Sequence, residues 1–213
     1  RSNQQAVFID SSGRSFATEA HELPSARGQG EPLSGRFAMV AGESFEHVLL
    51  GDDKQALLLA SDAGYGFVAE YSDLLSRNKA GKAVLSLPVG AKVLPPVVVK
   101  QPDTDLVLCI SNEGRMLVFP VADLPKLSKG KGNKLVSIPS ARAASREEYV
   151  CQLAIVPADG SVTLVAGKRK LGLKADDLAH YHGERGRRGN KLPRGLQRID
   201  EVQVSQGNDG GSD

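Results

Sequence analysis

Hydrophobic residues occur along the chain in short runs separated by turns rich in glycine, serine, aspartate or asparagine. Three segments share this plan: "VFIDSSGRSFATEAHEL" (7–23), "LLASDAGYGFVAEYSDL" (58–74) and "LCISNEGRMLVFPVADL" (108–124). In each segment two apolar runs flank a glycine-containing turn, which is the pattern of a β-hairpin. An acidic residue followed by leucine ends every copy, so the segments are predicted to be structural repeats.

The copies also keep one internal spacing. Gly13, Gly64 and Gly114 each precede the acid of an acid–leucine pair by nine residues. The segment "TLVAGKRKLGLKADDL" (163–178) fits as a fourth copy, with Lys168 in the place of the glycine, and the periods are 51, 50 and 54 residues. A sandwich with coincidental spacing is the alternative, but four copies in phase favour a repeat architecture.

Each repeat has room for two more strands after its acid–leucine pair. Third-strand candidates are "RFAMV", "AVLSLP" and "LVSIP", and fourth-strand candidates are "HVLL", "VLPPVVV" and "EYVCQLAIV". Four strands in about fifty residues is typical of a propeller blade. The sequence therefore predicts an all-β disc of about four blades, with repeats near 6–55, 56–105, 106–160 and 161–204. Helix signals are weak, and the polar tail 205–213 is predicted to be disordered.

The loop "SKGKGNKL" (128–135) contains three lysines and two glycines and has no acidic residue. A flexible linker, a nucleotide phosphate cradle and one part of a polyanion-binding surface are the three interpretations. Counterparts occupy the same slot of the other repeats: "SARGQGEPL" (25–33), "SRNKAGKAVL" (76–85) and "GERGRRGNKLPRGL" (183–196). A linker would not recur in phase with a fold. A nucleotide cradle fits poorly, because Ser76 and Ala83 stand where the P-loop pattern needs its first glycine and its final serine or threonine.

Charge is segregated along a chain that is almost neutral overall. The totals are 27 basic and 25 acidic residues, yet the stretch from Lys168 to Arg198 holds ten basic and three acidic ones, which leaves the rest at minus five. Such a pattern predicts a polyanion site on a neutral body. The structural alternative for any one loop is a solvated turn.

Duplex DNA is the favoured polyanion, because the loops contain no Phe or Trp on which single-stranded bases could stack. Glycines are expected to let the backbone approach phosphates, while lysine and arginine neutralise them. Contacts to about seven phosphates would give a slope of log affinity against log salt of about −6. The residues predicted to contact DNA are Arg27, Arg77, Lys79, Lys82, Lys126, Lys129, Lys131, Lys134, Lys168, Arg169, Lys170, Arg185, Arg187, Arg188, Lys191 and Arg194.

The motifs "ASDAGYGFV", "GRMLVFPVADLP", "SKGKGNKL" and "GERGRRG…RGLQRID" resemble the family of C-terminal domains of the topoisomerase IV A subunit (ParC) and, more distantly, of the DNA gyrase A subunit. The resemblance spans nearly the whole chain except the tail. It implies a β-pinwheel, in which blades exchange strands and a basic rim binds and bends duplex DNA. It also implies a bacterial, cytoplasmic, nucleoid-associated type IIA topoisomerase whose partner is an ATPase subunit; ATP and Mg would act elsewhere in that enzyme.

Two departures from the family limit what carries over. The family's discs usually have five or six blades, whereas four repeats are present here, so a leading blade is expected to be missing or the ring to be open. The start without methionine also suggests a piece of a longer protein. The gyrase Gln-Arg-Arg-Gly-Gly-Lys-Gly box has only a degenerate echo at residues 186–191. Topoisomerase IV substrate discrimination is therefore favoured over gyrase wrapping.

No catalytic residue, cofactor or metal site is expected in this chain. The resemblance places the DNA-cleaving tyrosine in another domain, and none of Tyr65, Tyr71, Tyr149 and Tyr181 has an Arg-Tyr setting. The pair His180 and His182 lacks a third metal ligand. An enzyme in a propeller funnel thus ranks last, behind a docking platform whose basic last repeat binds an acidic partner such as a condensin.

Cys109 and Cys151 lie in apolar runs and are predicted to be buried, reduced thiols, which favours a cytosolic compartment. No stretch is long and apolar enough to predict a membrane span, and the first residues have no signal-peptide character. No membrane partner is expected.

Overall fold

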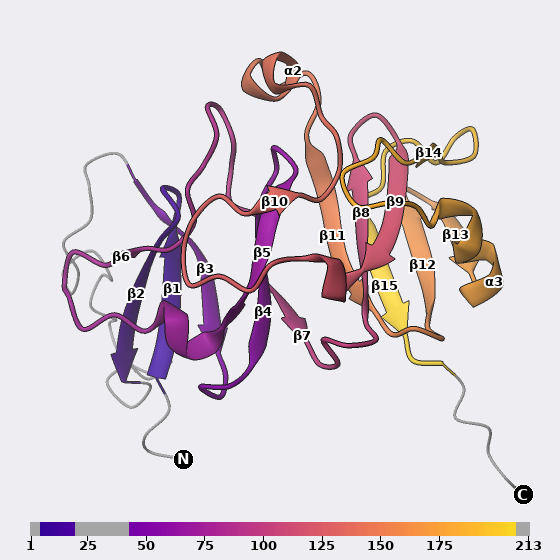
Figure 1. The fold of residues 1–213 in the computed structure, drawn as a ribbon. Coiled ribbons are helices and arrows are strands. Elements are labelled where there is room, and N and C mark those ends of the chain that lie inside the picture. The colour runs from indigo at the N-terminus through magenta and orange to yellow at the C-terminus, as the bar shows by residue number, and fades with distance from the viewer. Residues whose placement is uncertain (1–4, 20–42, 208–213) are drawn as a thin grey trace, which may run out of the picture.

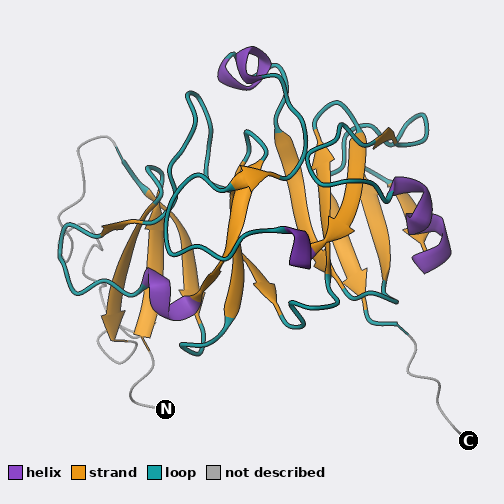
Figure 2. Ribbon diagram, in the orientation of Figure 1, coloured by secondary structure: helices purple, strands orange, loops and turns teal. Residues whose placement is uncertain are grey.

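The computed structural model describes residues 5–19 and 43–207. They form four small antiparallel sheets in a row, from the indigo sheet near the N-terminus to the orange and yellow sheet near the C-terminus (Figure 1). Helices in these two ranges are limited to short turns (Figure 2). The predicted all-β, blade-based fold is confirmed. Because the first and last sheets lie at opposite ends, the described sheets form an open row and not a closed ring (Figure 1).

Each sheet is built on a hairpin and one later strand of the same repeat, which pairs with the first hairpin strand. The hairpins are β1 (Gln5–Asp10) with β2 (Arg14–Glu19), β4 (Ala56–Ser61) with β5 (Tyr65–Glu70), β8 (Leu106–Ser111) with β9 (Arg115–Pro120), and β12 (Ser161–Ala166) with β13 (Arg169–Leu173). The later strands are β3 (Phe45–Leu50), β7 (Val97–Val99), β11 (Val150–Val156) and β15 (Glu201–Ser205). Ser205 therefore ends a strand, although the sequence predicts that the disordered tail starts there.

Three sheets gain a fourth strand from the repeat that follows. β6 (Lys82–Ala83) pairs with β2, β10 (Asn133–Lys134) pairs with β5, and β14 (Asn190–Lys191) pairs with β9. This exchange of strands between neighbouring blades confirms the pinwheel. The fourth sheet, within the described ranges, has three strands in the order β13-β12-β15.

The exchange corrects the predicted third strands. "AVLSLP" and "LVSIP" do not form strands within their own blades. At or just before the start of each run, a two-residue strand, β6 or β10, pairs with the preceding sheet instead. β7 is also shorter than its predicted run, since Pro95 and Pro96 lack the N–H groups that a ladder needs. The candidate "RFAMV" lies outside the described residues.

A glycine makes each donated strand possible. Gly132 precedes β10 with φ of +80°, and a Cβ added there would lie 2.0 Å from the carbonyl oxygen of Gly66 in β5. Gly81 and Gly189 hold the same position before β6 and β14, also with positive φ and close backbone neighbours. Only a residue without a Cβ allows the two backbones to approach this closely.

The three acid–leucine pairs in the described ranges lie in or directly beside one-turn helices, whereas Glu22 and Leu23 lie outside the described residues. Asp73 accepts a hydrogen bond from the backbone N–H of Glu70 at 3.0 Å, and Asp177 accepts one from Lys174 at 3.0 Å. The following Leu74 and Leu178 are buried. The acid thus fixes the turn and the leucine anchors it. These turns are η2 (Tyr71–Leu74), η3 (Val121–Asp123) and α3 (Ala175–Leu178), and a further 3-10 turn, η4 (Ala179–Tyr181), follows α3 directly.

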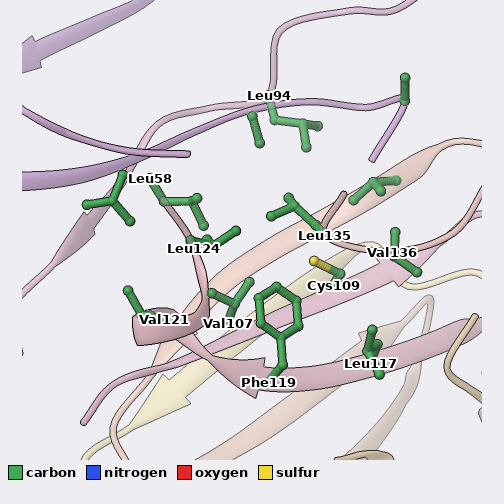
Figure 3. Close-up of a cluster of buried hydrophobic side chains, with 14 of the residues drawn as sticks. Leu58, Leu94, Val107, Cys109, Leu117, Phe119, Val121, Leu124, Leu135 and Val136 are labelled. Atoms are coloured by element: carbon green, nitrogen blue, oxygen red, sulfur yellow. The ribbon is translucent and has the colours of Figure 1, made fainter. Parts of the chain in front are cut away.

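The core lies between consecutive sheets. The largest cluster joins the second and third sheets, and Figure 3 shows Leu135, which follows β10, in this cluster with Leu58 of β4 and Phe119 of β9. Separate clusters join the first sheet to the second and the third to the fourth. Burying a leucine such as Leu135 stabilises the fold by about 1.5–3 kcal/mol. Donated strands therefore add apolar anchors to the interfaces between blades.

A short helix, α2 (Ser140–Ala144), lies between β10 and β11 and projects beyond the sheets (Figure 1). Both cysteines are free; Cys109 is buried and Cys151 is half-buried. In the described part of the chain, no helix has the length and apolar character needed to span a membrane.

Candidate nucleic-acid interface

Three basic loops run from the acid–leucine turn of one repeat to the strand donated to the preceding sheet. We call them the second basic loop (residues 76–83), the third basic loop (126–134) and the fourth basic loop (183–191), after their repeats. The first counterpart and its Arg27 lie outside the described residues. Because each loop ends in a donated strand, the repeat places all three at corresponding edges of successive sheets.

Backbone hydrogen bonds join the three loops to one another. The N–H of Gly130 in the third loop donates to Val84 O at 2.9 Å, and the N–H of Ser86 donates back to Gly130 O at 2.9 Å. In the same way, the N–H of Gly186 in the fourth loop donates to Leu135 O at 2.9 Å. Residues 84–86 and 135–137 directly follow β6 and β10, so the third and fourth loops are each hydrogen-bonded to the segment that continues the preceding loop, and we call this connected series of loops the track.

The third loop presents four exposed lysines, Lys126, Lys129, Lys131 and Lys134. None of them forms an ion pair with an acidic side chain among the described residues. Lys131 lies over the ring of Tyr65, with its Nζ 4.4 Å from the ring centroid. These charges are available for phosphates, and the tyrosine holds one of them in place.

The fourth loop divides its arginines between internal and external roles. Arg188 donates to Ser137 O at 2.9 Å and lies 2.7 Å from the buried carboxylate of Glu148. Arg185 donates to Lys134 O at 2.7 Å, which ties the fourth loop to β10. Arg187 is exposed, and within the described ranges its one ion pair is with the exposed Glu184, three residues earlier, at 3.0 Å. Arg187 and the exposed Lys191 are the cations of this loop most free to meet a ligand.

The second loop follows the same division. Arg77 and Lys79 are exposed, whereas Lys82 is half-buried and its ammonium donates to the carbonyl of Asp73 at 2.6 Å. Lys82, Arg185 and Arg188 therefore have internal polar partners, and their contact with DNA stays a prediction.

Two arginines outside the predicted set of DNA contacts hold these loops. Arg14 Nε donates to Ala80 O at 3.0 Å, and Arg115 Nη1 donates to Gly189 O at 3.1 Å. Each directly follows a hairpin glycine, Gly13 or Gly114, at the start of the strand that receives the next repeat. That shared position is a sequence signal that could have identified them.

A second group of cations lies at the end of the row. Lys168 stands in the β12–β13 turn, and Arg169 and Lys170 begin β13; all three are exposed. The guanidinium of Arg169 lies against Gly195, next to the exposed Arg194. We call Lys168, Arg169, Lys170 and Arg194 the end cluster. No described hydrogen bond joins it to the track of basic loops.

Several loop glycines have a structural role. Gly81, Gly132 and Gly189 each lie close to the backbone of the preceding sheet on the side where a Cβ would stand, and their contact with phosphates stays a prediction. Gly130 remains a candidate for that role, because nothing lies within 4 Å of a Cβ built on it. The glycines are thus required mainly for strand exchange.

Two of the four tyrosines are buried in the fold. Tyr71 is buried and donates to Leu49 O at 3.1 Å, and burial raises the pKa of its hydroxyl above the ordinary value. Burial likewise raises the pKa of Tyr181. No group of three or more His, Cys, Asp or Glu side chains in this part of the chain could hold a metal ion.

Comparison with known proteins connects this geometry to one family. The family described as DNA gyrase C-terminal domain, beta-propeller, matches residues 55–100 and 105–140. The A subunit of DNA topoisomerase 4 from Pseudomonas aeruginosa is 60% identical over 96% of this chain, and that from Escherichia coli strain K12 is 53% identical over 96%. The chain spans 27% of the length of each of these two relatives.

Solved structures show the same fold. The E. coli ParC C-terminal domain is 52% identical, with a TM-score of 0.90 over 97% of this chain and 83% of that one. A C-terminal domain of DNA gyrase A, at 17% identity, has a TM-score of 0.70 over 97% of this chain and 67% of that one. The second likeness concerns the fold alone.

Proposed function

Because the chain belongs to the family of C-terminal domains of the topoisomerase IV A subunit, we propose that it is a non-catalytic module that binds and bends duplex DNA. The observation that supports the proposal is the joining of three basic loops by backbone hydrogen bonds into one track. A track of fixed cations concentrates positive potential on a protein whose net charge is only +2, and so favours the binding of a polyanion along the loops.

Bending follows from the rigidity of the track. Backbone hydrogen bonds and buried leucines hold the loops in place, so a duplex must adapt to them to reach several cations at once. Bending a site of about 20–30 base pairs by 40–90° costs on the order of 1–6 kcal/mol, which additional phosphate contacts offset. Readout of sequence should be weak, because backbone contacts carry no base information.

At the level of the whole enzyme, we propose that the module positions DNA for topoisomerase IV and helps it to discriminate supercoiled and catenated substrates. In this proposal the parent is a type IIA isomerase whose partner is an ATPase subunit, and ATP and Mg act outside this chain. A bent track would favour DNA that is already curved or crossed, because such DNA needs less deformation to follow it.

The end cluster supports a second candidate function. Lys168, Lys170 and Arg194 are exposed at the last sheet and have no described hydrogen bond to the track. A separate patch of this kind would suit an acidic protein, and a condensin is a candidate. In this view the last repeat docks a protein while the loops hold DNA.

One set of variants separates the two functions. Reversal of three of the exposed loop cations, Lys129, Lys131 and Arg187, to glutamate should weaken the binding of linear and supercoiled DNA and reduce the steepness of its salt dependence by about 3, with an unchanged circular dichroism spectrum. The matched single control is Lys100→Glu, in the turn after β7, set against Lys131→Glu. Wild-type DNA binding by the triple variant would refute the leading proposal.

Reversal of Lys168, Lys170 and Arg194 addresses docking. The docking candidate predicts loss of binding to a purified condensin with DNA binding retained. If the condensin binds neither wild type nor variant, docking fails.

A further inference from the structure

An apolar tip projects from the connection between β6 and β7. The N–H of Ala91 donates to Pro88 O at 3.0 Å, which closes a turn over Pro88, Val89 and Gly90, and Gly90 has a φ of +77°. This is the geometry of a type II turn with glycine at its third position. Val89, at its second position, is 82% exposed, more than any other large hydrophobic residue in the described ranges.

The tip is held rigidly away from the sheets. Asp62, in the β4–β5 turn, accepts from the N–H of Lys92 at 2.8 Å, and its own N–H donates to Lys92 O at 2.9 Å. Arg146 pairs with both oxygens of Asp62, at 2.9 and 2.8 Å, and donates to Gly90 O at 3.1 Å. Gly90 also lies close to the backbone of α2, since a Cβ added to it would lie 2.7 Å from the carbonyl oxygen of Ala144. Val89 therefore cannot fold back to bury itself without breaking these contacts.

The root of the tip is bonded to the third basic loop. Ser86 donates to Gly130, which lies between Lys129 and Lys131. Val89 follows Ser86 by three residues, a span of at most about 10 Å. Val89 and Lys131 also line one hollow of about 490 Å³ together with Tyr65, Ile138 and residues of α2. The exposed Lys92 adds a further cation beside the turn.

We propose that Pro88 and Val89 form an apolar wedge that enters the minor groove of the duplex held by Lys129 and Lys131 and thereby sets where it bends. The proposal rests on the proposed DNA-binding function. Apolar side chains inserted at a base step unstack it and kink the duplex, at a cost of a few kcal/mol per step. The cations beside the tip, Lys131 and Lys92, favour DNA over an apolar protein surface as the occupant, because they would hold the phosphates that border a groove.

The test measures bending and unstacking apart from binding. A duplex of about 40 base pairs carries fluorophores at its ends and 2-aminopurine at one central step, in a series that moves this step along the site. Wild-type protein should raise energy transfer between the ends and raise 2-aminopurine fluorescence at one position. In Val89→Ala both signals should fall by more than half, the affinity should fall about threefold to tenfold, and the salt slope should stay the same. Val98→Ala, at an exposed valine of β7, is the matched control and should behave as wild type.

The outcomes distinguish the wedge from the function on which it rests. If wild-type protein shows no salt-dependent DNA binding, the proposed function fails. If wild type binds and bends DNA but Val89→Ala bends and unstacks it equally well, the wedge is overturned and the hollow serves another contact. Val89→Thr, which keeps the side-chain shape and adds a hydroxyl, should bend DNA less than wild type. Because the substituted side chain is exposed, the melting temperatures of both variants should match that of wild type.

Discussion

The guanidinium of Arg188 lies 2.7 Å from the carboxylate of Glu148, whose side chain is 1% exposed. Arg142 Nε lies 3.3 Å from the other oxygen of the same carboxylate. The neighbouring Arg187 has a side chain that is 73% exposed and pairs only with Glu184 on the surface. Two adjacent arginines of one basic loop therefore serve different purposes, one anchoring the loop to the third repeat and the other facing solvent.

This difference predicts opposite effects of charge reversal. Arg188→Glu places a second negative charge against the buried Glu148, which keeps Arg142 as a partner, and should lower the free energy of unfolding by about 1–3 kcal/mol. Arg187→Glu should leave that free energy within about 0.5 kcal/mol of wild type and weaken DNA binding instead. Urea unfolding followed by circular dichroism measures the first effect, and a duplex mobility shift measures the second. Equal unfolding midpoints for the two variants would show that Glu148 does not anchor the loop.

Strand exchange predicts a second pair of variants. Gly132→Ala brings a Cβ into the carbonyl of Gly66 at a positive φ, so β10 should detach from β5 and the melting temperature should fall by several degrees. Gly172→Ala is the control, because nothing lies within 4 Å of a Cβ at that position in β13. Differential scanning calorimetry compares them. A Gly132→Ala protein as stable as Gly172→Ala would contradict the strand-exchange geometry.

The cysteines predict a dependence on pH. Burial raises the pKa of Cys109 to about 12 and that of Cys151 to about 11, whereas an unfolded thiol ionises near 8.5. Between pH 8.5 and the raised pKa values, the folded thiols keep protons that the unfolded thiols lose. The stability that the two thiols contribute is therefore fully present below about pH 8.5 and declines as pH rises towards 11. Iodoacetamide at pH 8 should label neither thiol in the native protein and both in urea. Rapid native labelling at Cys109 would show that its burial is incorrect.

Residue spacing predicts the parts of the fold that depend on local sequence. The nine-residue offset from Gly64 to Asp73 locates the hairpin and its capped turn, because both form within a few residues of each other. The same spacing predicts the donated strands in the wrong place. Asn133 and Lys134 form a strand only because they pair with Gly66 and Tyr65 of the preceding repeat. A two-residue segment is too short for its sequence to show that it pairs with another repeat.

The candidate nucleic-acid interface is likewise predictable only where it depends on local sequence. In-phase loops indicate where the basic side chains lie in the repeat, and the described loops are joined as successive edges of one row. The sequence does not show which cations are free. Arg188 and Arg187 look alike in "GRRG", and their difference depends on Glu148, forty residues away.

The salt dependence of duplex binding, measured with one loop reversed at a time, tests most directly whether a single duplex follows all three loops. The variants are Arg77→Glu with Lys79→Glu, Lys129→Glu with Lys131→Glu, and Arg187→Glu with Lys191→Glu. Each pair should reduce the steepness of the log–log slope by about 2, and the reductions should add when pairs are combined, because each lost phosphate contact removes about 0.9. The continuous track would be contradicted if charge reversal in the third loop changed the slope while charge reversal in the second or fourth loop left it at the wild-type value.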